Sequence, residues 1–183
     1  MGDYRPAMTA GDSIAPTTDS PRLRQHEGVA RVRTVLQEQS AQGPLVDLGQ
    51  PARTAAEAAA ALDVEVGQIA SSLLFEAEHD DGSRRPLLVL TSGGHRVDEI
   101  QLTGLLDLVS LSRVDAETVR AITGFAIGGV APVGLLRPVD TVVDVSLGRY
   151  DHVWASGGHP CVVLRTTYDE LLRMTAGQAA EVG

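Results

Sequence analysis

A glycine-rich segment, Thr123–Gly134, is the first candidate for chemistry. It places four glycines and Pro132 within twelve residues, between two ordinary-looking segments. Glycine lets the backbone adopt positive φ and lets another molecule approach closely, while proline fixes its own φ. We therefore expect a shaped apolar loop whose backbone N–H groups can bind a carbonyl oxygen or a phosphate, as an oxyanion hole does. The alternative is a tight connection between packed elements.

Two further glycine segments share the pattern Ser-Gly-Gly-His, at Ser92–His95 and Ser156–His159. One hypothesis is that the two histidines meet, either as metal ligands or as an acid and a base. Neither histidine has a second histidine or a cysteine at helical spacing, and Cys161 is the single cysteine of the chain. The pattern therefore does not favour a metal centre, and no metal is expected.

Several familiar catalytic and binding motifs are absent from the sequence. It contains no Gly-x-Ser-x-Gly elbow, no Walker loop and no Gly-x-Gly-x-x-Gly that opens a helix after a strand. Conventional serine-hydrolase and nucleotide-binding sites are therefore not indicated, and no cofactor is expected.

The charge of the chain limits its partners. The formal net charge is -9 over 183 residues, and all fifteen basic residues are arginine. Broad electrostatic binding to DNA or RNA relies on clusters of basic residues, so the composition leaves room only for a small local patch. A mechanism that needs a lysine ammonium group is not open to this protein.

Alternating and periodic apolar residues predict the elements that must position these segments. We expect helices over residues 26–39, 54–62, 115–122 and 168–175 and one beginning near Glu99, and strands over 44–48, 66–77, 86–91, 108–112, 141–145 and 161–165. Ser71 and Ser72 fall near the start of the long strand over 66–77, which we expect to pair antiparallel with 86–91. Thr54 opens the alanine-rich helix with a capping-box pattern, and this helix is expected to serve packing only.

The intervals between the strands are too uneven for repeated right-handed crossovers. We therefore favour a mixed sheet with flanking helices over a doubly wound parallel fold. Residues 1–23 are polar and rich in Gly, Pro, Ser and Thr, which predicts a disordered N-terminal tail. The folded domain is expected over residues 24–176, with 177–183 as a C-terminal tail.

No apolar run is long enough for a membrane span, and the amino terminus lacks the pattern of a signal peptide. With one cysteine, no internal disulfide can form. We therefore expect a cytoplasmic protein without a membrane partner.

The order of these motifs resembles the YbaK-type prolyl-tRNA editing domain family. The resemblance rests on Thr123-Gly124-Phe125 followed by Gly128-Gly129-Val130-Ala131-Pro132-Val133-Gly134, then on Val153–Gly158 and a final Asp-Glu-Leu-Leu helix. It extends over roughly residues 24–176. It implies an α/β (α+β-like) fold, a single compact domain with a twisted, barrel-like mixed sheet and flanking helices.

The resemblance also implies an activity. It implies a freestanding aminoacyl-tRNA deacylase, which hydrolyses the ester between a small, wrongly attached amino acid and the terminal adenosine of a tRNA. The partners would be the acceptor end of an aminoacyl-tRNA and, as a further candidate, an aminoacyl-tRNA synthetase. Water is the attacking group in this family, assisted by a ribose hydroxyl of the tRNA. Gly129 would lie in the loop whose amides hold the substrate carbonyl, and the remaining substrate-binding candidates would be Thr123, Gly124, Phe125, Gly128, Pro132, Ser72, Ser156, Gly157 and His95.

The sequence departs from the family at one position. Most characterised members carry a lysine on the first long strand, where this chain has Ser71. A serine hydroxyl supplies no charge, so His159 becomes the candidate for a compensating cation, together with Gly129 and Ser71 as the catalytic set. The alternative is a catalytically weak or inactive binding module that retains the aminoacyl pocket.

Overall fold

Strand β2 (Ile69–Glu78) is the centre of the fold, because it pairs with three other strands. The computed structural model describes residues 15–183. Its eight-stranded sheet runs in the order β1, β7, β6, β2, β3, β5, β8, and β4 pairs with β2 outside this path. The other strands are β1 (Leu45–Asp47), β3 (Arg84–Ser92), β4 (Ser110–Arg113), β5 (Asp140–Asp144), β6 (Val153–His159), β7 (Val162–Thr166) and β8 (Gln178–Ala180).

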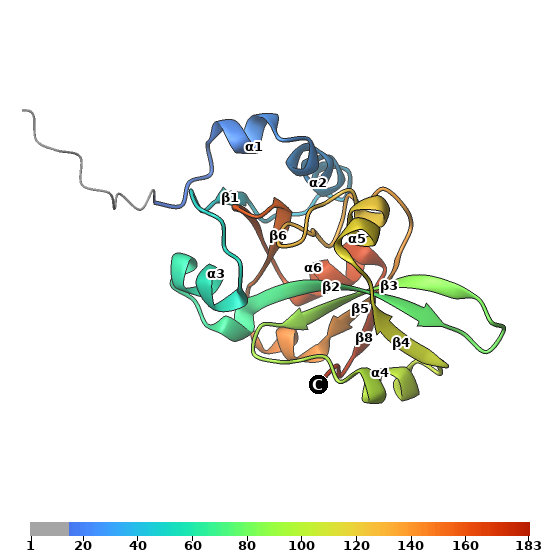
Figure 1. The fold of residues 1–183 in the computed structure, drawn as a ribbon. Helices are drawn as coiled ribbons and strands as arrows, with labels where there is room; N and C mark the ends of the chain where they lie inside the picture. The colour runs from blue at the N-terminus through green and yellow to red at the C-terminus, as the bar shows by residue number, and fades with distance from the viewer. Residues whose placement is uncertain (1–14) are drawn as a thin grey trace, which may run out of the picture.

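The sheet is mixed, as the uneven strand intervals predict. β2 pairs antiparallel with β3 and β4 but parallel with β6, and β5 pairs parallel with β3 and β8. The sheet curls into a half-barrel, so that β1 and β7 lie across from β3 and β5 rather than in one plane with them (Figure 1). The fold is therefore a single α/β domain around a curved mixed sheet.

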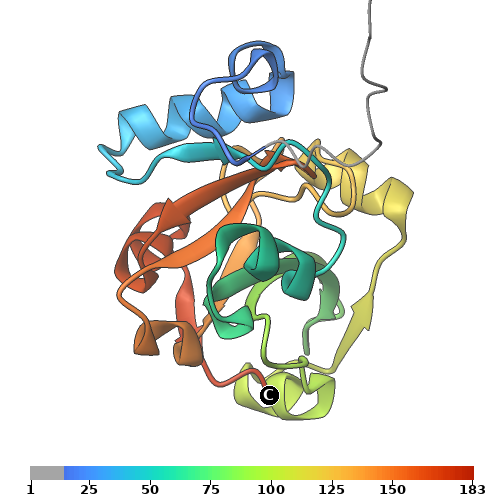
Figure 2. The ribbon, with the colours of Figure 1, turned by 90° about the vertical axis from the view of Figure 1, so that its left-hand side faces the viewer.

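Six α-helices flank the sheet in the described part of the chain: α1 (Pro21–Gln25), α2 (Glu27–Glu38), α3 (Ala55–Leu62), α4 (Glu99–Leu105), α5 (Ala116–Thr123) and α6 (Tyr168–Thr175). Two 3-10 helices, η1 (Val66–Gln68) and η2 (Val145–Arg149), complete the elements. The predicted cap at Thr54 is present, and Asp115 and Thr167 cap their helices in the same way, since each of the three side chains accepts a backbone N–H in the first turn. Figure 2 shows α1 and α2 together at one end of the sheet and α4 beside the C-terminus at the other.

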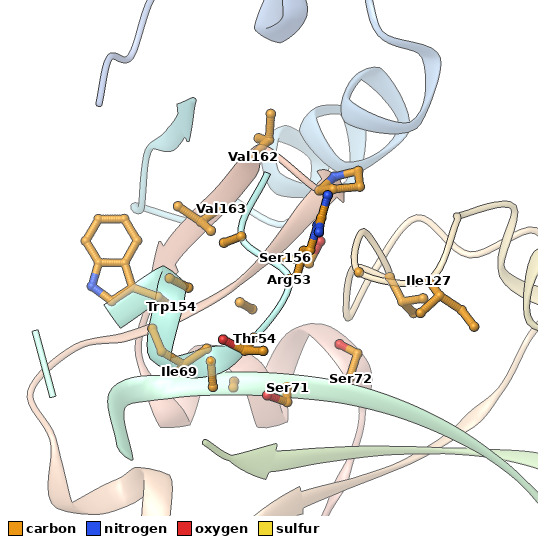
Figure 3. A pocket seen from close by; sticks show the side chains of 18 of the residues that line it. Arg53, Thr54, Ile69, Ser71, Ser72, Ile127, Trp154, Ser156, Val162 and Val163 are labelled. Atoms are coloured by element: carbon orange, nitrogen blue, oxygen red, sulfur yellow. The ribbon is translucent and has the colours of Figure 1, made fainter. Parts of the chain in front are cut away.

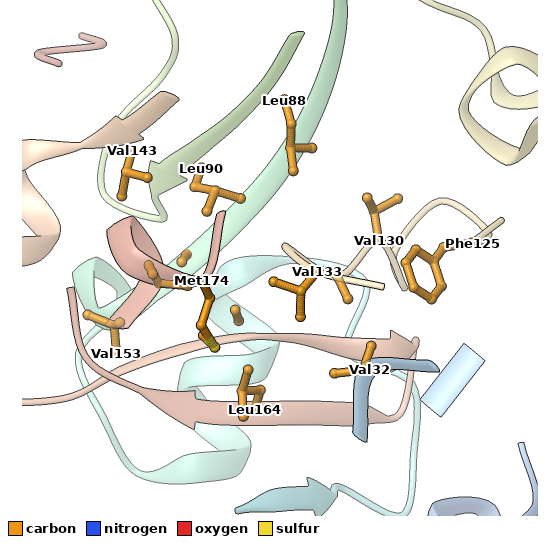
Figure 4. Packing of buried hydrophobic residues seen from close by; sticks show 14 of the residues in the cluster. Val32, Leu88, Leu90, Phe125, Val130, Val133, Val143, Val153, Leu164 and Met174 are labelled. Carbon is orange, nitrogen blue, oxygen red and sulfur yellow. The ribbon is translucent and has the colours of Figure 1, made fainter. Parts of the chain in front are cut away.

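Both faces of β3 are buried, which explains its continuous apolar run. Leu88 and Leu90 pack into the larger cluster with residues of α2, α6 and the glycine-rich loop (Figure 4). Leu87 and Val89 point to the opposite face and pack with Leu102 of α4 in a second cluster. Because successive side chains of a strand alternate between faces, one strand supplies both clusters.

Parts of the two predicted tails are packed against the folded domain. Residues 1–14 of the predicted N-terminal tail lie outside the described residues, but Thr17 forms a β-bridge with Asp47 and Leu23 is buried. At the other end, β8 extends the sheet by pairing with β5, and Val182 is fully buried. Both terminal segments are short, so the sequence gives little periodicity by which to recognise them. No helix within residues 15–183 has the length and apolar character needed to cross a membrane.

Candidate active site

A pocket of about 260 Å³ opens between the start of α3, the first half of β2, strands β6 and β7, and the glycine-rich loop (Figure 3). Aliphatic side chains and Trp154 form most of its wall, and four hydroxyl-bearing residues interrupt it: Thr54, Ser71, Ser72 and Ser156. This mixture of apolar surface and a few polar groups is typical of a small-molecule site.

The sheet itself creates the pocket. The parallel pairing of β2 with β6 lasts for only two residue pairs, Ile69 with Trp154 and Ala70 with Ala155. Beyond them the two strands separate, so Ser71 and Ser72 on β2 and Ser156 on β6 come to line the space between. The two adjacent serines, which the sequence places near the start of the long strand, thus lie beside a pocket of the sheet.

Ser72 carries a hydroxyl without a partner. Its Oγ is buried and forms no hydrogen bond with any described residue. A buried polar group without a partner costs about 1–3 kcal/mol of stability, so such groups are uncommon in folded proteins. Because the oxygen itself is buried beside the pocket, a polar atom of a ligand can reach it only after the side chain rotates.

The glycine-rich loop contributes Ile127, Gly128 and Val130 to the pocket wall. Gly128 has a φ of +85°, which a residue with a side chain rarely adopts. Within residues 15–183, the N–H groups of Gly128 and Val130 donate no hydrogen bond to another backbone group. The loop residues that line the pocket, Ile127, Gly128 and Val130, therefore all have backbone N–H groups that no described backbone carbonyl accepts.

Gly129 has a different role from the predicted one. Its N–H donates to the carbonyl oxygen of Ala126 at 2.9 Å and closes a turn. A β-carbon at position 129 would meet Pro160 and the His159 backbone, not the open pocket. Glycine suits this position because the loop packs tightly against the turn between β6 and β7, and its amide, which closes a turn, is not free to hold a substrate carbonyl.

The structure places four other loop candidates outside the pocket lining. The Thr123 hydroxyl accepts the N–H of Phe125 at the end of α5, and Gly124 caps that helix with a φ of +75°. Phe125 is buried in the core beneath the Arg31 guanidinium, and Pro132 is buried. These residues shape the loop and do not line the pocket.

The two Ser-Gly-Gly-His patterns form different structures, and their histidines do not meet. Ser156–His159 belongs to strand β6, and its pairing with β7 is irregular between Ser156 and His159. Gly157 lies against Val162 and Leu45 in this strand. His95 lies elsewhere, where its Nδ1 is 3.1 Å from Oδ2 of the buried Asp144. Within the described residues, no group of three His, Cys, Asp or Glu side chains is arranged to hold a metal ion.

His159 is poorly suited to supply a cation. Its Nδ1 accepts the N–H of Cys161 at 3.0 Å, and its ring packs edge-on against His26 with the ring centres 4.6 Å apart. Partial burial, the neighbouring His26 and Arg22 together lower the pKa of His159 below its usual value. The structure therefore does not support His159 as the replacement for the family's lysine.

Arg53 is the residue of the pocket that the sequence analysis missed. It stands just before the cap of α3, a helix that was expected to serve packing only, and it is the one charged residue in the described pocket lining. The only signal in the sequence for this place in the pocket is the position of Arg53 next to Thr54, because a side chain at a helix start can project past the capping residue.

Comparison with known proteins agrees with this architecture. A family model described as the aminoacyl-tRNA editing domain matches residues 49–174. The proline–tRNA ligase of Bacillus licheniformis is 32% identical over 137 residues, which are 74% of this chain and 23% of that protein. The chain thus spans about a quarter of the length of that ligase. The YwhH protein of Bacillus subtilis is 26% identical over 140 residues, 76% of this chain and 86% of that one.

A solved structure reported as a candidate trans-editing enzyme for prolyl-tRNA synthetase has 39% sequence identity and a TM-score of 0.75, and the match covers 86% of this chain and 98% of that one. The residues that carry the sequence resemblance lie within the region that the family model matches. Because that region is more than half of the chain, the protein belongs to the family of aminoacyl-tRNA editing domains.

Proposed function

We propose that this protein is a trans-editing deacylase that hydrolyses the ester bond of a mischarged tRNA carrying a small amino acid. The observation that carries the proposal is the pocket, which combines an apolar wall, the unpartnered Ser72 hydroxyl and the free amides of Gly128 and Val130. The aminoacyl group would enter the pocket, while the terminal adenosine of the acceptor end would stay at its mouth.

The size of the pocket favours a small amino acid. Sites for drug-sized ligands typically enclose about 300–1,000 Å³. At about 260 Å³, this pocket lies below that range. An aminoacyl group with a short side chain fits such a volume.

The proposed reaction needs no side-chain nucleophile. Water attacks the ester carbonyl, the carbonyl oxygen becomes an oxyanion, and the bond to the ribose oxygen breaks as that oxygen takes up a proton. Hydrogen bonds from the Gly128 and Val130 amides would stabilise the oxyanion, and one such donor contributes roughly 10²–10³ in rate. No carboxylate or imidazole lines the described pocket. The vicinal ribose hydroxyl of the substrate is therefore the best candidate to orient the water.

The similarity to proline–tRNA ligases suggests which substrates to test first. We propose that the natural substrate is a proline tRNA that carries a wrong, small amino acid, and that a prolyl-tRNA synthetase is a partner in this editing. Release of the amino acid should be measured for the same tRNA charged with alanine, serine, cysteine and proline, and for an alanine tRNA charged with alanine.

Two serine variants control this assay. Ser72→Ala removes a hydroxyl of the pocket wall and should reduce release, whereas Ser112→Ala, on the exposed part of β4, should not. Release from none of the charged tRNAs would refute the deacylase proposal. Tight binding of a mischarged tRNA without release would instead identify a binding module that keeps the pocket.

A further inference from the structure

We propose that the guanidinium group of Arg53 binds the phosphodiester that precedes the terminal nucleotide of the tRNA, at the mouth of the pocket. The inference rests on the proposed function and adds an anchoring residue to it. Arg53 would act by positioning the substrate and not on the ester itself.

The charge around the pocket singles out this side chain. Arg53 is the one charged residue that lines the described pocket, and Figure 3 shows it between Ser156 and the loop that carries Ile127. No carboxylate among residues 15–183 forms an ion pair with it, whereas Arg22, Arg31 and others are paired. A guanidinium without a carboxylate partner at the edge of an apolar pocket is free to bind an anion from solution.

The backbone holds Arg53 in place from both sides. The N–H of Ala52 donates to the carbonyl oxygen of Pro160 at 3.1 Å, and the N–H of Arg53 itself donates to the Glu57 carboxylate at 2.6 Å. Thr54 then caps α3 by accepting the N–H of Glu57 at 3.1 Å. The Glu57 carboxylate is thus engaged by the backbone of this segment. The side chain of Arg53 therefore projects from a fixed point on the rim of the pocket.

The chemistry of the substrate determines which anion Arg53 can meet. An aminoacyl ester has a free ammonium group and no carboxylate, so its amino-acid part would be repelled by a guanidinium. The only negative groups of a charged acceptor end are its phosphodiesters, and the nearest one to a bound aminoacyl group is the linkage before the terminal nucleotide. Arginine recognises phosphate oxygens with two parallel N–H donors.

The net charge of the protein makes such a contact important. At -9, the protein as a whole repels a polyanionic RNA, so a local cation must hold the acceptor end. Ser71 of β2, which also lines the pocket, is neutral, and the chain has no lysine. Arg53 lines the same pocket from the opposite side, on the segment that leads into α3.

Binding of an RNA minihelix that has a tRNA acceptor end but carries no amino acid tests the inference without any turnover. Two versions of the RNA are compared, one with the natural phosphodiester before the terminal nucleotide and one with a neutral methylphosphonate there. Wild type should bind the natural RNA about tenfold more tightly than the neutral one, because a charge-assisted hydrogen bond is lost. Arg53→Gln should bind both RNAs with equal affinity, and this affinity should match the weaker affinity of wild type for the neutral RNA.

Salt dependence and a second arginine complete the test. Loss of one phosphate contact should reduce the slope of log affinity against log salt by about 0.7 for a single-stranded end. Arg120→Gln, an exposed position on α5 outside the described pocket lining, changes the net charge equally and should keep the preference of wild type.

The inference fails if Arg53→Gln binds like wild type, if it keeps the preference for the natural linkage, or if wild type does not bind the natural RNA. These outcomes do not depend on deacylation. A protein that releases no amino acid but shows the expected binding pattern would refute the proposed reaction and leave the role of Arg53 intact.

Discussion

Gly129 of the glycine-rich loop lies directly against Pro160, in the turn that joins β6 to β7. A β-carbon at position 129 would lie 3.0 Å from Cδ of Pro160 and 3.1 Å from Cα of His159. Pro160 also lines the pocket, next to the loop residues Gly128 and Val130. The contact therefore fixes the free amides of the loop relative to the rest of the pocket.

The first prediction is that Gly129→Ala reduces both stability and activity. The added methyl group must push the loop or the turn aside, and overpacking of this kind costs about 1–3 kcal/mol. A displaced loop moves the amides of Gly128 and Val130, so deacylation should fall further than the loss of folded protein explains. Thermal unfolding and turnover on the folded fraction measure the two effects separately.

Gly104→Ala is the matched control for this change. Gly104 lies in α4, where an added β-carbon would have no atom within 4 Å, and it does not require positive φ. Alanine in a helix interior is favoured over glycine by about 0.5–1 kcal/mol, so this variant should be slightly more stable and fully active. Equal activity of Gly129→Ala and wild type would contradict the proposed role of the contact.

The second prediction concerns Ser72 and separates stability from function. Its buried hydroxyl has no partner among the described residues, so Ser72→Ala should leave the free energy of unfolding unchanged or raise it by about 1 kcal/mol. For a chain of this size, that corresponds to an increase of about 2–4 °C in Tm. If the hydroxyl binds a polar atom of the substrate, kcat/KM should fall in the same variant. A decrease in Tm would show that Ser72 has a structural partner.

Much of the fold follows from local signals in the sequence. The capping residues Thr54 and Thr167 mark the starts of α3 and α6, and the antiparallel pairing of β2 with β3 follows from two apolar runs around a polar hairpin. These features depend on residues close together in the chain. The mixed sheet could also be predicted, because the intervals between strands exclude repeated crossovers.

The candidate site could be predicted only in part. Ser71, Ser72, Gly128 and Ser156 do line one pocket, but the identical patterns around His95 and His159 have different environments. Those environments come from distant residues, which a local pattern cannot reveal. Arg53 was missed for the same reason: its neighbours predict a helix start, and only the separation of β2 and β6, two strands far apart in the sequence, places that start beside a pocket.

The third prediction concerns pH and His159. Because the pKa of His159 in the folded protein lies below that in the unfolded chain, the folded state binds fewer protons there. This contribution to stability is fully present above the unfolded pKa of about 6.5 and is lost as the pH falls through the lower folded value. Wild type should therefore lose more Tm between pH 7.5 and pH 5 than His159→Asn, which cannot titrate but keeps an acceptor for the Cys161 N–H.

The same variant tests the role of His159 in turnover. The ring does not line the pocket, and its lowered pKa favours the neutral form at pH 7 and above. Deacylation by His159→Asn between pH 7 and 8.5, corrected for spontaneous ester hydrolysis, should therefore follow the wild-type profile. The hypothesis of a catalytic cation at this position would be restored if wild-type activity declined with rising pH and the activity of His159→Asn did not.

The attachment of α1 depends on one buried carboxylate. The side chain of Asp47 on β1 is 4% exposed, and its oxygens accept hydrogen bonds from Ser20 Oγ at 2.6 Å, Arg22 Nη1 at 2.6 Å and the Gly49 N–H at 2.9 Å. Burial raises the pKa of this carboxyl, but the three hydrogen bonds and the Arg22 charge outweigh it, and the net shift is downward. The segment before α2, assigned to a disordered tail from its composition, is thus tied to the sheet.

The last prediction is that Asp47→Ala is the most destabilising of these changes. It leaves Arg22 and Ser20 without their acceptor, and hydrogen bonds to a charged group contribute about 1.5–3 kcal/mol each. For a chain of this size, a loss of about 2–3 kcal/mol lowers Tm by roughly 4–12 °C. Asp19→Ala is the control, because the Asp19–Arg24 pair is exposed and such pairs stabilise little.

The lowered pKa of Asp47 stabilises the fold above the unfolded pKa of about 3.9, and this stabilisation is lost at more acidic pH. The difference in Tm between wild type and Asp47→Ala should therefore shrink as the pH falls below 4. A constant difference from pH 7 to pH 3 would show that packing, and not the charge of Asp47, holds α1 against the sheet.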